Sequence, residues 1–176
     1  VMIEGPGHVP LNEVTANVTL AKSLIGDVPY YVLGPLVTDI ASGHDHIASA
    51  IGAAVSASAG VDLLCYLTPS EHLALPTPEE VKEGLIAYRI AAHAGDLVKL
   101  RDKSIKWDLK MTEARRTLDW DAQLALSIDP EKAAKIHGRT GQHPGNNVPC
   151  TMCGGACVYI MLPKQRKYAT EDKKLQ

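Results

Sequence analysis

Three cysteines near the end of this 176-residue sequence form its most distinctive chemical pattern. Cys150, Cys153 and Cys157 lie within eight residues, and the glycines between the last two let the backbone wrap around one centre. Three thiolates leave one coordination position open, which suits an iron-sulfur cluster whose unique iron binds a small molecule. Structural zinc, with His143 or His137 as the fourth ligand, is one alternative. A disulfide between the first two cysteines is the other.

Two histidines follow separate apolar runs of the sequence. His8 closes a turn at 4–8 that holds two glycines and a proline, and His72 closes a turn at 68–72. Neutral imidazoles brought together from neighbouring strand ends can hold a divalent cation and leave positions open for substrate or water. We therefore treat His8 and His72 as candidate metal ligands, and hydrogen bonding to the loop backbone is the alternative.

Two further polar side chains belong to apolar runs of the sequence, Glu4 to the run at 1–4 and Tyr31 to the run at 30–33. Glu4 stands at the end of one run, where a carboxylate is costly to bury unless it binds a hydroxyl, an amine or a cation. Tyr31 can offer its hydroxyl to the substrate pocket that Glu4 would line, or pack its ring in the core. We expect Glu4 and Tyr31 to be substrate ligands, and Cys65, inside another apolar run, to be a core thiol.

Parallel strands must position these side chains. Short apolar or β-branched runs at 1–4, 30–33 and 62–67 predict three strands, and the segments between them have helical spacing. This alternation predicts an α/β fold, either a (β/α) barrel or a doubly wound sheet. In both, chemistry gathers at the carboxyl ends of the strands, where the candidate ligands lie.

Helices are expected between and after the strands. The spacing of apolar residues predicts helices at 11–24, 45–59, 111–126 and 130–137, and Thr77 followed by proline and two glutamates marks the start of a longer one. The helix at 45–59 is dense in alanine and glycine, with Ile47, Ile51 and Val55 four residues apart, which suits close packing on a sheet. In the longer helix, one apolar face is traced by Val81, Leu85, Ile86, Ile90, His93, Leu97 and Leu100.

Composition excludes several classes of partner. The formal net charge is -2, so no strong field favours nucleic acid or an anionic membrane. Hydrophobic residues make up 45% and charged residues 22%, the balance of a globular domain with a real core. The uncharged, Ala- and Gly-rich stretch at 47–61 is too short to span a bilayer. No secretory leader is visible, so we expect a cytoplasmic, reducing compartment, and the opening apolar run suggests a C-terminal piece of a longer chain.

Several blocks of the sequence resemble the phosphomethylpyrimidine synthases, the ThiC family. They are MIEGPGHVP at 2–10, LGPLVTDI at 33–40, CYLTP at 65–69 and EHL at 71–73, followed by IAAHA at 90–94 and DW at 119–120. Members of that family use S-adenosylmethionine and a [4Fe-4S] cluster to rearrange aminoimidazole ribotide into the hydroxymethylpyrimidine phosphate of thiamine. The resemblance implies the last strands of a (β/α)8 barrel at 1–100, a helical segment at 101–140, and an iron-sulfur cysteine loop with a tail at 141–176.

The same resemblance implies roles for individual residues. Cys150, Cys153 and Cys157 match the ligands of the cluster, and His8 and His72 match the ligands of a second metal, Zn2+ or Fe2+. The positions that contact the ribotide correspond to Glu4 and Tyr31. An electron donor and a homodimer are the implied protein partners, and 176 residues without the upstream substrate contacts are expected to lack turnover.

The sequence departs from the family pattern at two places. Three residues separate Cys153 from Cys157 where many members have four, and Ser42-Gly43-His44 stands where Pro-Gly-Tyr is common. A related branch, the 5-hydroxybenzimidazole synthases, converts the same ribotide into the lower-ligand base of cobamides and is the alternative function. A zinc-stabilised, non-catalytic module is the second alternative.

Overall fold

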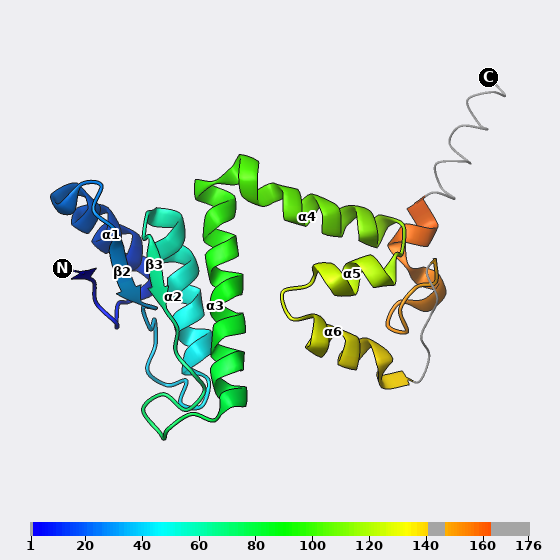
Figure 1. Ribbon diagram of the computed structural model, residues 1–176, viewed down its shortest axis with the longest axis horizontal. Coiled ribbons are helices and arrows are strands. Elements are labelled where there is room, and N and C mark those ends of the chain that lie inside the picture. Colours follow the sequence, from blue (N-terminus) through cyan, green and yellow to red (C-terminus); the bar gives the residue numbers. More distant parts are fainter. Residues whose placement is uncertain (1, 141–146, 163–176) are drawn as a thin grey trace. The chain divides into compact units, whose positions relative to one another are not determined.

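The computed structural model describes residues 2–140 and 147–162 (Figure 1). The chain forms two compact units, 1–105 and 106–176. The first unit is an α/β layer, and the second consists of helices and the cysteine loop.

A small parallel sheet forms the centre of the first unit. Strands β1 (Ile3–Glu4), β2 (Tyr30–Leu33) and β3 (Leu63–Cys65) are ordered β1-β2-β3. The predicted parallel direction is confirmed, and β2 has the predicted bounds. The third strand is shorter than predicted, because its last residue, Cys65, pairs with Leu33 at the end of β2.

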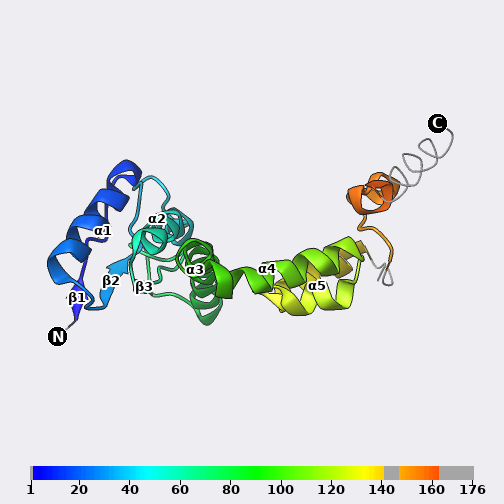
Figure 2. The same cartoon turned by 90° about the horizontal axis from the view of Figure 1, so that it is seen from above.

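Helices α1 (Leu11–Ile25), α2 (Asp45–Ala59) and α3 (Pro78–Lys99) follow the three strands, and α2 lies between the other two (Figures 1 and 2). The start of α3 is the predicted one, because Thr77 and Glu80 form a reciprocal capping box before and inside the first turn. On β2, Tyr30 and Val32 point toward the helices and are buried. They pack with Val18 of α1, with Val61 just before β3, and with Leu64 of β3.

Small residues build the contact between α2 and the end of α3, and the apolar face expected for α3 is wrong. The buried residues of α3 are Gly84, Tyr88, Ala91 and Gly95, whereas Leu85 and Ile90 are 44% and 54% exposed. Of the two glycines, Gly84 lies against the chain after β3 and Gly95 lies against α2. A Cβ on Gly95 would overlap the Cβ of Ala57 in α2. Helices that approach this closely leave no room for a large side chain at Gly95. On α2 the small residues are buried, as its density of alanine and glycine indicated, and Ile47 and Ile51 are exposed.

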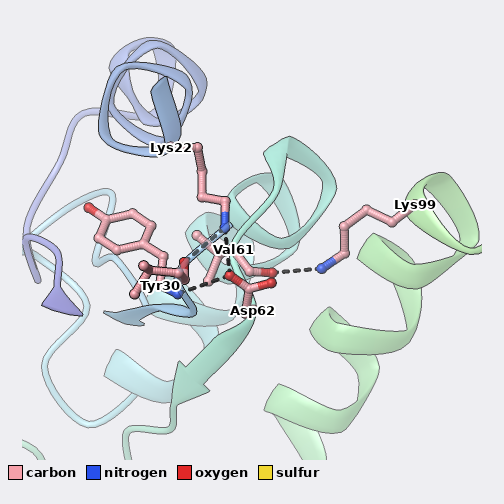
Figure 3. A network of polar contacts seen from close by, with 6 residues as sticks. Lys22, Tyr30, Val61, Asp62 and Lys99 are labelled. Carbon is pink, nitrogen blue, oxygen red and sulfur yellow. Dashed lines mark hydrogen bonds and ion pairs between the residues drawn. The ribbon is translucent and has the colours of Figure 1, made fainter. Parts of the chain in front are cut away.

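A polar network ties α1, the strands and α3 together at the amino ends of the strands (Figure 3). The Asp62 carboxylate accepts hydrogen bonds from the Tyr30 backbone amide at 2.9 Å and from Lys22 Nζ at 3.0 Å. Lys99 Nζ, near the end of α3, donates to the Val61 carbonyl at 2.6 Å. Burial alone would raise the pKa of Asp62, but the Tyr30 amide and the Lys22 ammonium outweigh it and lower that pKa.

The network predicts a pH-dependent contribution to stability. We expect Asp62→Asn to lower the free energy of unfolding at pH 7 by about 1 kcal/mol or less, since the Asp62 side chain is 42% exposed and water screens the pair. The folded-state pKa of Asp62 is depressed, so this contribution is complete above the unfolded-state pKa of about 4 and disappears as pH falls through the folded value. Denaturant titrations at several pH values measure it. Asp27→Asn, at an exposed turn, is the control, and an equal loss in both variants would contradict the prediction.

The second unit is helical. Helix α4 (Arg101–Arg116) crosses from the first unit into the second, and α5 (Trp120–Leu126) and α6 (Pro130–His137) follow. The predicted helix at 111–126 is wrong, because α4 already begins at Arg101 and the chain breaks at Leu118, where φ is 53°. The charged side chains at 101–110 are compatible with an exposed helix face.

Asp119 and Asp129 begin the last two helices by accepting hydrogen bonds from the amides of Ala122 and Lys132. The start of α6 is therefore the predicted one. No helix in the described residues combines the length and the apolar character that crossing a bilayer needs.

Candidate functional site

The turn after β1 holds His8 on a rigid backbone. Beyond the strands, the Gly5 amide donates to the Tyr31 carbonyl at 2.8 Å, and the Leu36 amide donates to the Gly7 carbonyl at 2.8 Å. His8 itself forms a β-bridge with Leu36. A Cβ on Gly5 would overlap the Tyr30 hydroxyl, which explains why this turn needs glycine. The ladder thus extends to His8 and fixes its main chain.

His72 lies in the tight turn after β3. Its φ is 61°, a left-handed conformation that is uncommon outside glycine, and the Leu73 amide donates to the Ser70 carbonyl at 2.9 Å. The ring centroids of His72 and His8 are 5.9 Å apart and their planes are inclined by 40°. The structure therefore brings together the two histidines that the sequence proposed as metal ligands, although 64 positions separate them.

Two aspartates contact this histidine pair, and the sequence analysis proposed neither of them as a ligand. Asp45, at the start of α2, is only 4% exposed, and its Oδ2 lies 2.9 Å from His72 Nδ1. That hydrogen bond raises the pKa of His72. Asp39 is exposed, and its Oδ1 lies 3.6 Å from His8 Nε2. Among the described residues, no group of three or more histidine, cysteine, aspartate or glutamate side chains is arranged to hold a metal ion.

Glu4, Tyr31 and Cys65 occupy the face of the sheet that α1 and α2 do not cover. Glu4 pairs with Tyr31 and Tyr31 pairs with Leu63, so alternation along β3 places Cys65 on the same face. A hydrogen bond with Cys65, together with burial and the charge of Glu4, raises the pKa of Tyr31 to about 12. The phenol is therefore protonated at neutral pH and able to donate a hydrogen bond.

This placement corrects the expectation that Cys65 is a core thiol. Cys65 is half-buried and contacts Tyr31 on the uncovered face, beside the candidate substrate ligands. Strands of a parallel sheet are apolar on both faces, so the run at 62–67 did not reveal which side the thiol would take.

The cysteine loop belongs to the second unit. The short 3-10 helix η2 (Gly154–Ala156) follows Cys153, with Gly154 at a φ of 49°. Hydrogen bonds from the backbone amides of Cys153 and Met152 lower the pKa of the Cys150 thiol. Cys153 is exposed and Cys157 is 8% exposed. All four cysteines of the chain are described, and all are free thiols, which disagrees with the disulfide alternative.

The donor set of this loop fits an iron-sulfur cluster in its chemistry. Three thiols lie close in sequence, and backbone amides already point to one sulfur, as they do around cluster thiolates. In the described part of the chain, the three thiols are not arranged as a group that could hold one metal ion, and they differ in burial: Cys157 is buried and Cys153 is exposed. Of the two histidines suggested for structural zinc, His137 stacks on Trp120 with ring centroids 4.2 Å apart, and His143 lies outside the described residues.

Two hydrogen bonds fasten the start of the cysteine loop to the helices. Trp120 Nε1 donates to the Val148 carbonyl at 2.8 Å, and the Asn147 amide donates to the Leu118 carbonyl at 3.0 Å. A largely apolar cavity of about 450 Å³ lies beside this attachment; its lining includes Met111, Arg115, Trp120, Ile136, His137 and Cys150. The tryptophan therefore connects α5 with the loop that carries the thiols.

Replacing Trp120 is expected to loosen the loop. Trp120→Phe keeps an aromatic ring, although a smaller one, and removes the hydrogen bond to Val148. That bond contributes about 1 kcal/mol, so the buried Cys157 thiol should react about fivefold faster with a thiol reagent. Trp107→Phe is the matched control, because Trp107 Nε1 donates to the Leu126 carbonyl at 2.7 Å, away from the loop. Equal acceleration in both variants would show that general destabilisation, and not the loop contact, controls the reaction.

The sequence of the chain is similar to a known protein family and to individual proteins of that family. The model of the radical SAM ThiC family matches residues 1–164. A phosphomethylpyrimidine synthase of Ignicoccus hospitalis is 55% identical over 98% of this chain and 39% of its own length. Proteins of the same name from Desulfitobacterium hafniense and Saccharolobus islandicus are 57% and 58% identical over 92% and 94% of this chain. The chain spans 37% and 38% of the length of these two relatives.

Proposed function

Because the chain belongs to the radical SAM ThiC family, we propose that it forms the C-terminal part of a phosphomethylpyrimidine synthase, which rearranges aminoimidazole ribotide into hydroxymethylpyrimidine phosphate. The observation that carries this proposal is the family match over 1–164, which includes both the strand-end residues and the cysteine loop. We assign 1–100 to the last part of a (β/α)8 barrel, 101–140 to a helical segment, and 141–176 to the cysteine loop and tail.

In this proposal Cys150, Cys153 and Cys157 hold a [4Fe-4S] cluster. Bound together, the cluster and S-adenosylmethionine supply the one-electron chemistry that removes a hydrogen atom from an unreactive carbon. The backbone amides of Met152 and Cys153 favour the thiolate of Cys150, which is the form that binds iron. The glycines between the second and third cysteines allow the backbone to bring the buried Cys157 to the same centre.

His8 and His72 hold a second metal, Zn2+ or Fe2+, in the proposed enzyme. The β-bridge at His8 and the tight turn at His72 fix the two main chains, and the rings already lie near each other. Two protein ligands leave coordination positions for substrate or water. Such a metal orients a substrate and polarises its oxygen or nitrogen atoms.

Glu4 and Tyr31 bind the ribotide in the proposed enzyme. The uncovered face of the sheet becomes the inner face of the barrel once the remaining strands pair with β1 and β3, and it presents Glu4, Tyr31 and Cys65 together. The carboxylate accepts hydrogen bonds from ribose hydroxyls or the amine, and the neutral phenol of Tyr31 donates one. Both groups keep the substrate in place while it is shielded from water.

The experiment uses the full-length protein, reconstituted anaerobically with aminoimidazole ribotide, S-adenosylmethionine and an electron donor. Hydroxymethylpyrimidine phosphate in the mass spectrum supports the proposal, and 5-hydroxybenzimidazole would assign the protein to the cobamide branch instead. Cluster-loaded protein that forms no 5'-deoxyadenosine would overturn both and favour the zinc-stabilised module. We expect residues 1–176 alone to give no turnover, since they span only 39% of the first relative.

Two further features of the proposed enzyme follow from its chemistry. Free thiols and an iron-sulfur cluster suit a reducing compartment, so we place the enzyme in the cytoplasm. We propose that it works as a homodimer, which light scattering on the full-length protein tests.

A further inference from the structure

We propose that Asp45 is a positioning residue that fixes His72 as a metal ligand through the Nε2 atom of its ring. The inference depends on one part of the proposed function, namely that His8 and His72 hold a divalent metal. It concerns a residue outside that pair, and it makes a separate prediction about metal affinity.

The burial of Asp45 is the first observation. Aspartate is seldom fully buried, and a carboxylate removed from water costs free energy unless it is paired. Asp45 is nevertheless 4% exposed. Its place in the first turn of α2 favours a negative charge, because the helix dipole is positive there. The fold therefore keeps a carboxylate at this point, and its Oδ2 lies 2.9 Å from His72 Nδ1.

The hydrogen bond determines which nitrogen of His72 can bind a metal. A neutral imidazole carries one proton, and a metal binds the nitrogen that has none. The carboxylate of Asp45 only accepts hydrogen bonds, so it selects the tautomer with the proton on Nδ1. The lone pair is then on Nε2. Carboxylate-histidine-metal arrangements of this kind fix both the tautomer and the orientation of the ligand.

The surroundings of the two histidines show why His72 needs this support. The His72 side chain is 57% exposed, so few packing contacts restrict its ring, and Asp45 supplies a fixed partner from a helix. Asp39 does not do the same for His8, since Asp39 is exposed and its Oδ1 is 3.6 Å from His8 Nε2, beyond a good hydrogen bond. His8 is fixed instead through its backbone bridge to Leu36.

Cobalt binding tests the inference in the full-length protein. All three loop cysteines are replaced with serine, so that Co2+ cannot bind the loop thiolates, and affinity is followed by the visible absorbance of the bound ion. We expect Asp45→Ala to weaken Co2+ binding about 10- to 100-fold and Asp45→Asn, which keeps a carbonyl oxygen and the shape, to weaken it less. Asp62→Asn is the control, because it removes a carboxylate from the same unit at the other end of the strands.

The outcomes separate the inference from the proposed metal site. Loss of Co2+ binding in His72→Ala together with weak binding in Asp45→Ala supports the inference. Loss in His72→Ala with unchanged affinity in both Asp45 variants overturns it and leaves the metal site in place. Unchanged binding in His8→Ala and His72→Ala overturns the site and the inference with it. Isosteric Asp45→Asn keeps the test valid if Asp45→Ala does not fold.

Discussion

Replacing Cys150, Cys153 or Cys157 with serine in the full-length protein is expected to lower product formation by more than about 100-fold. Loss of a residue that only supports a metal ligand lowers activity by about 10- to 100-fold, and loss of the ligand itself should cost more. Each thiolate is a ligand in the proposed site, and a serine hydroxyl is a poor replacement for it. Iron and sulfide content, measured after anaerobic reconstitution, should fall in parallel with the formation of 5'-deoxyadenosine. Both readouts are independent of the hydroxymethylpyrimidine product.

Cys65→Ser is the control for these variants. Cys65 lies in the first unit, on the sheet, so its replacement should leave the iron and sulfide content unchanged. A Cys153→Ser protein with the full complement of iron would contradict the assignment of the loop cysteines. It would also remove the main chemical argument for a radical enzyme.

A valine in place of Gly95 is expected to lower the free energy of unfolding by about 3 kcal/mol, the upper end of the usual range for overpacking. Even a Cβ at this position would overlap the Cβ of Ala57, and the backbone of α2 stands directly behind it. The helices must therefore separate, or one of them must distort. Denaturant titration of the full-length protein measures the loss.

Ala94→Val is the matched control for Gly95→Val. Ala94 is the preceding residue of α3 and is exposed, so valine there should cost only the difference in helix propensity, about 0.5 kcal/mol. Equal losses at the two positions would show that the α2–α3 contact tolerates a larger side chain. In that case the small residues would not be required for packing.

Local signals in the sequence predicted most elements of the first unit. Helix α2 has the expected bounds, because Gly60 ends it, and α3 begins where the threonine cap and proline stand. The buried face of α3 was wrong because two faces compete in its sequence, one with large apolar residues and one with small ones. Only the distance between the helices decides between them, and that distance depends on Ala57, far away in the sequence.

The candidate site shows the same division between local and distant information. The rule that polar residues gather at strand ends was enough to propose His8 and His72 as neighbours. Asp45 was not identified, because as the first residue of a helix it has a sufficient local explanation, and its contact with His72 spans 27 positions. The contact between Tyr31 and Cys65 depends on strand register, which an apolar run does not reveal.

The polar network around Asp62 has a consequence for how such a protein evolves. It joins Lys22, Tyr30 and Asp62 at the amino ends of the strands, whereas His8 and His72 follow the carboxyl ends. Substitutions in the loops after the strands can therefore change the substrate or the product without disturbing these contacts. Because the stabilising contacts lie at one end of the strands, variants with substitutions at the other end keep enough stability to fold. New reactions can therefore evolve at the carboxyl ends by gene duplication and divergence.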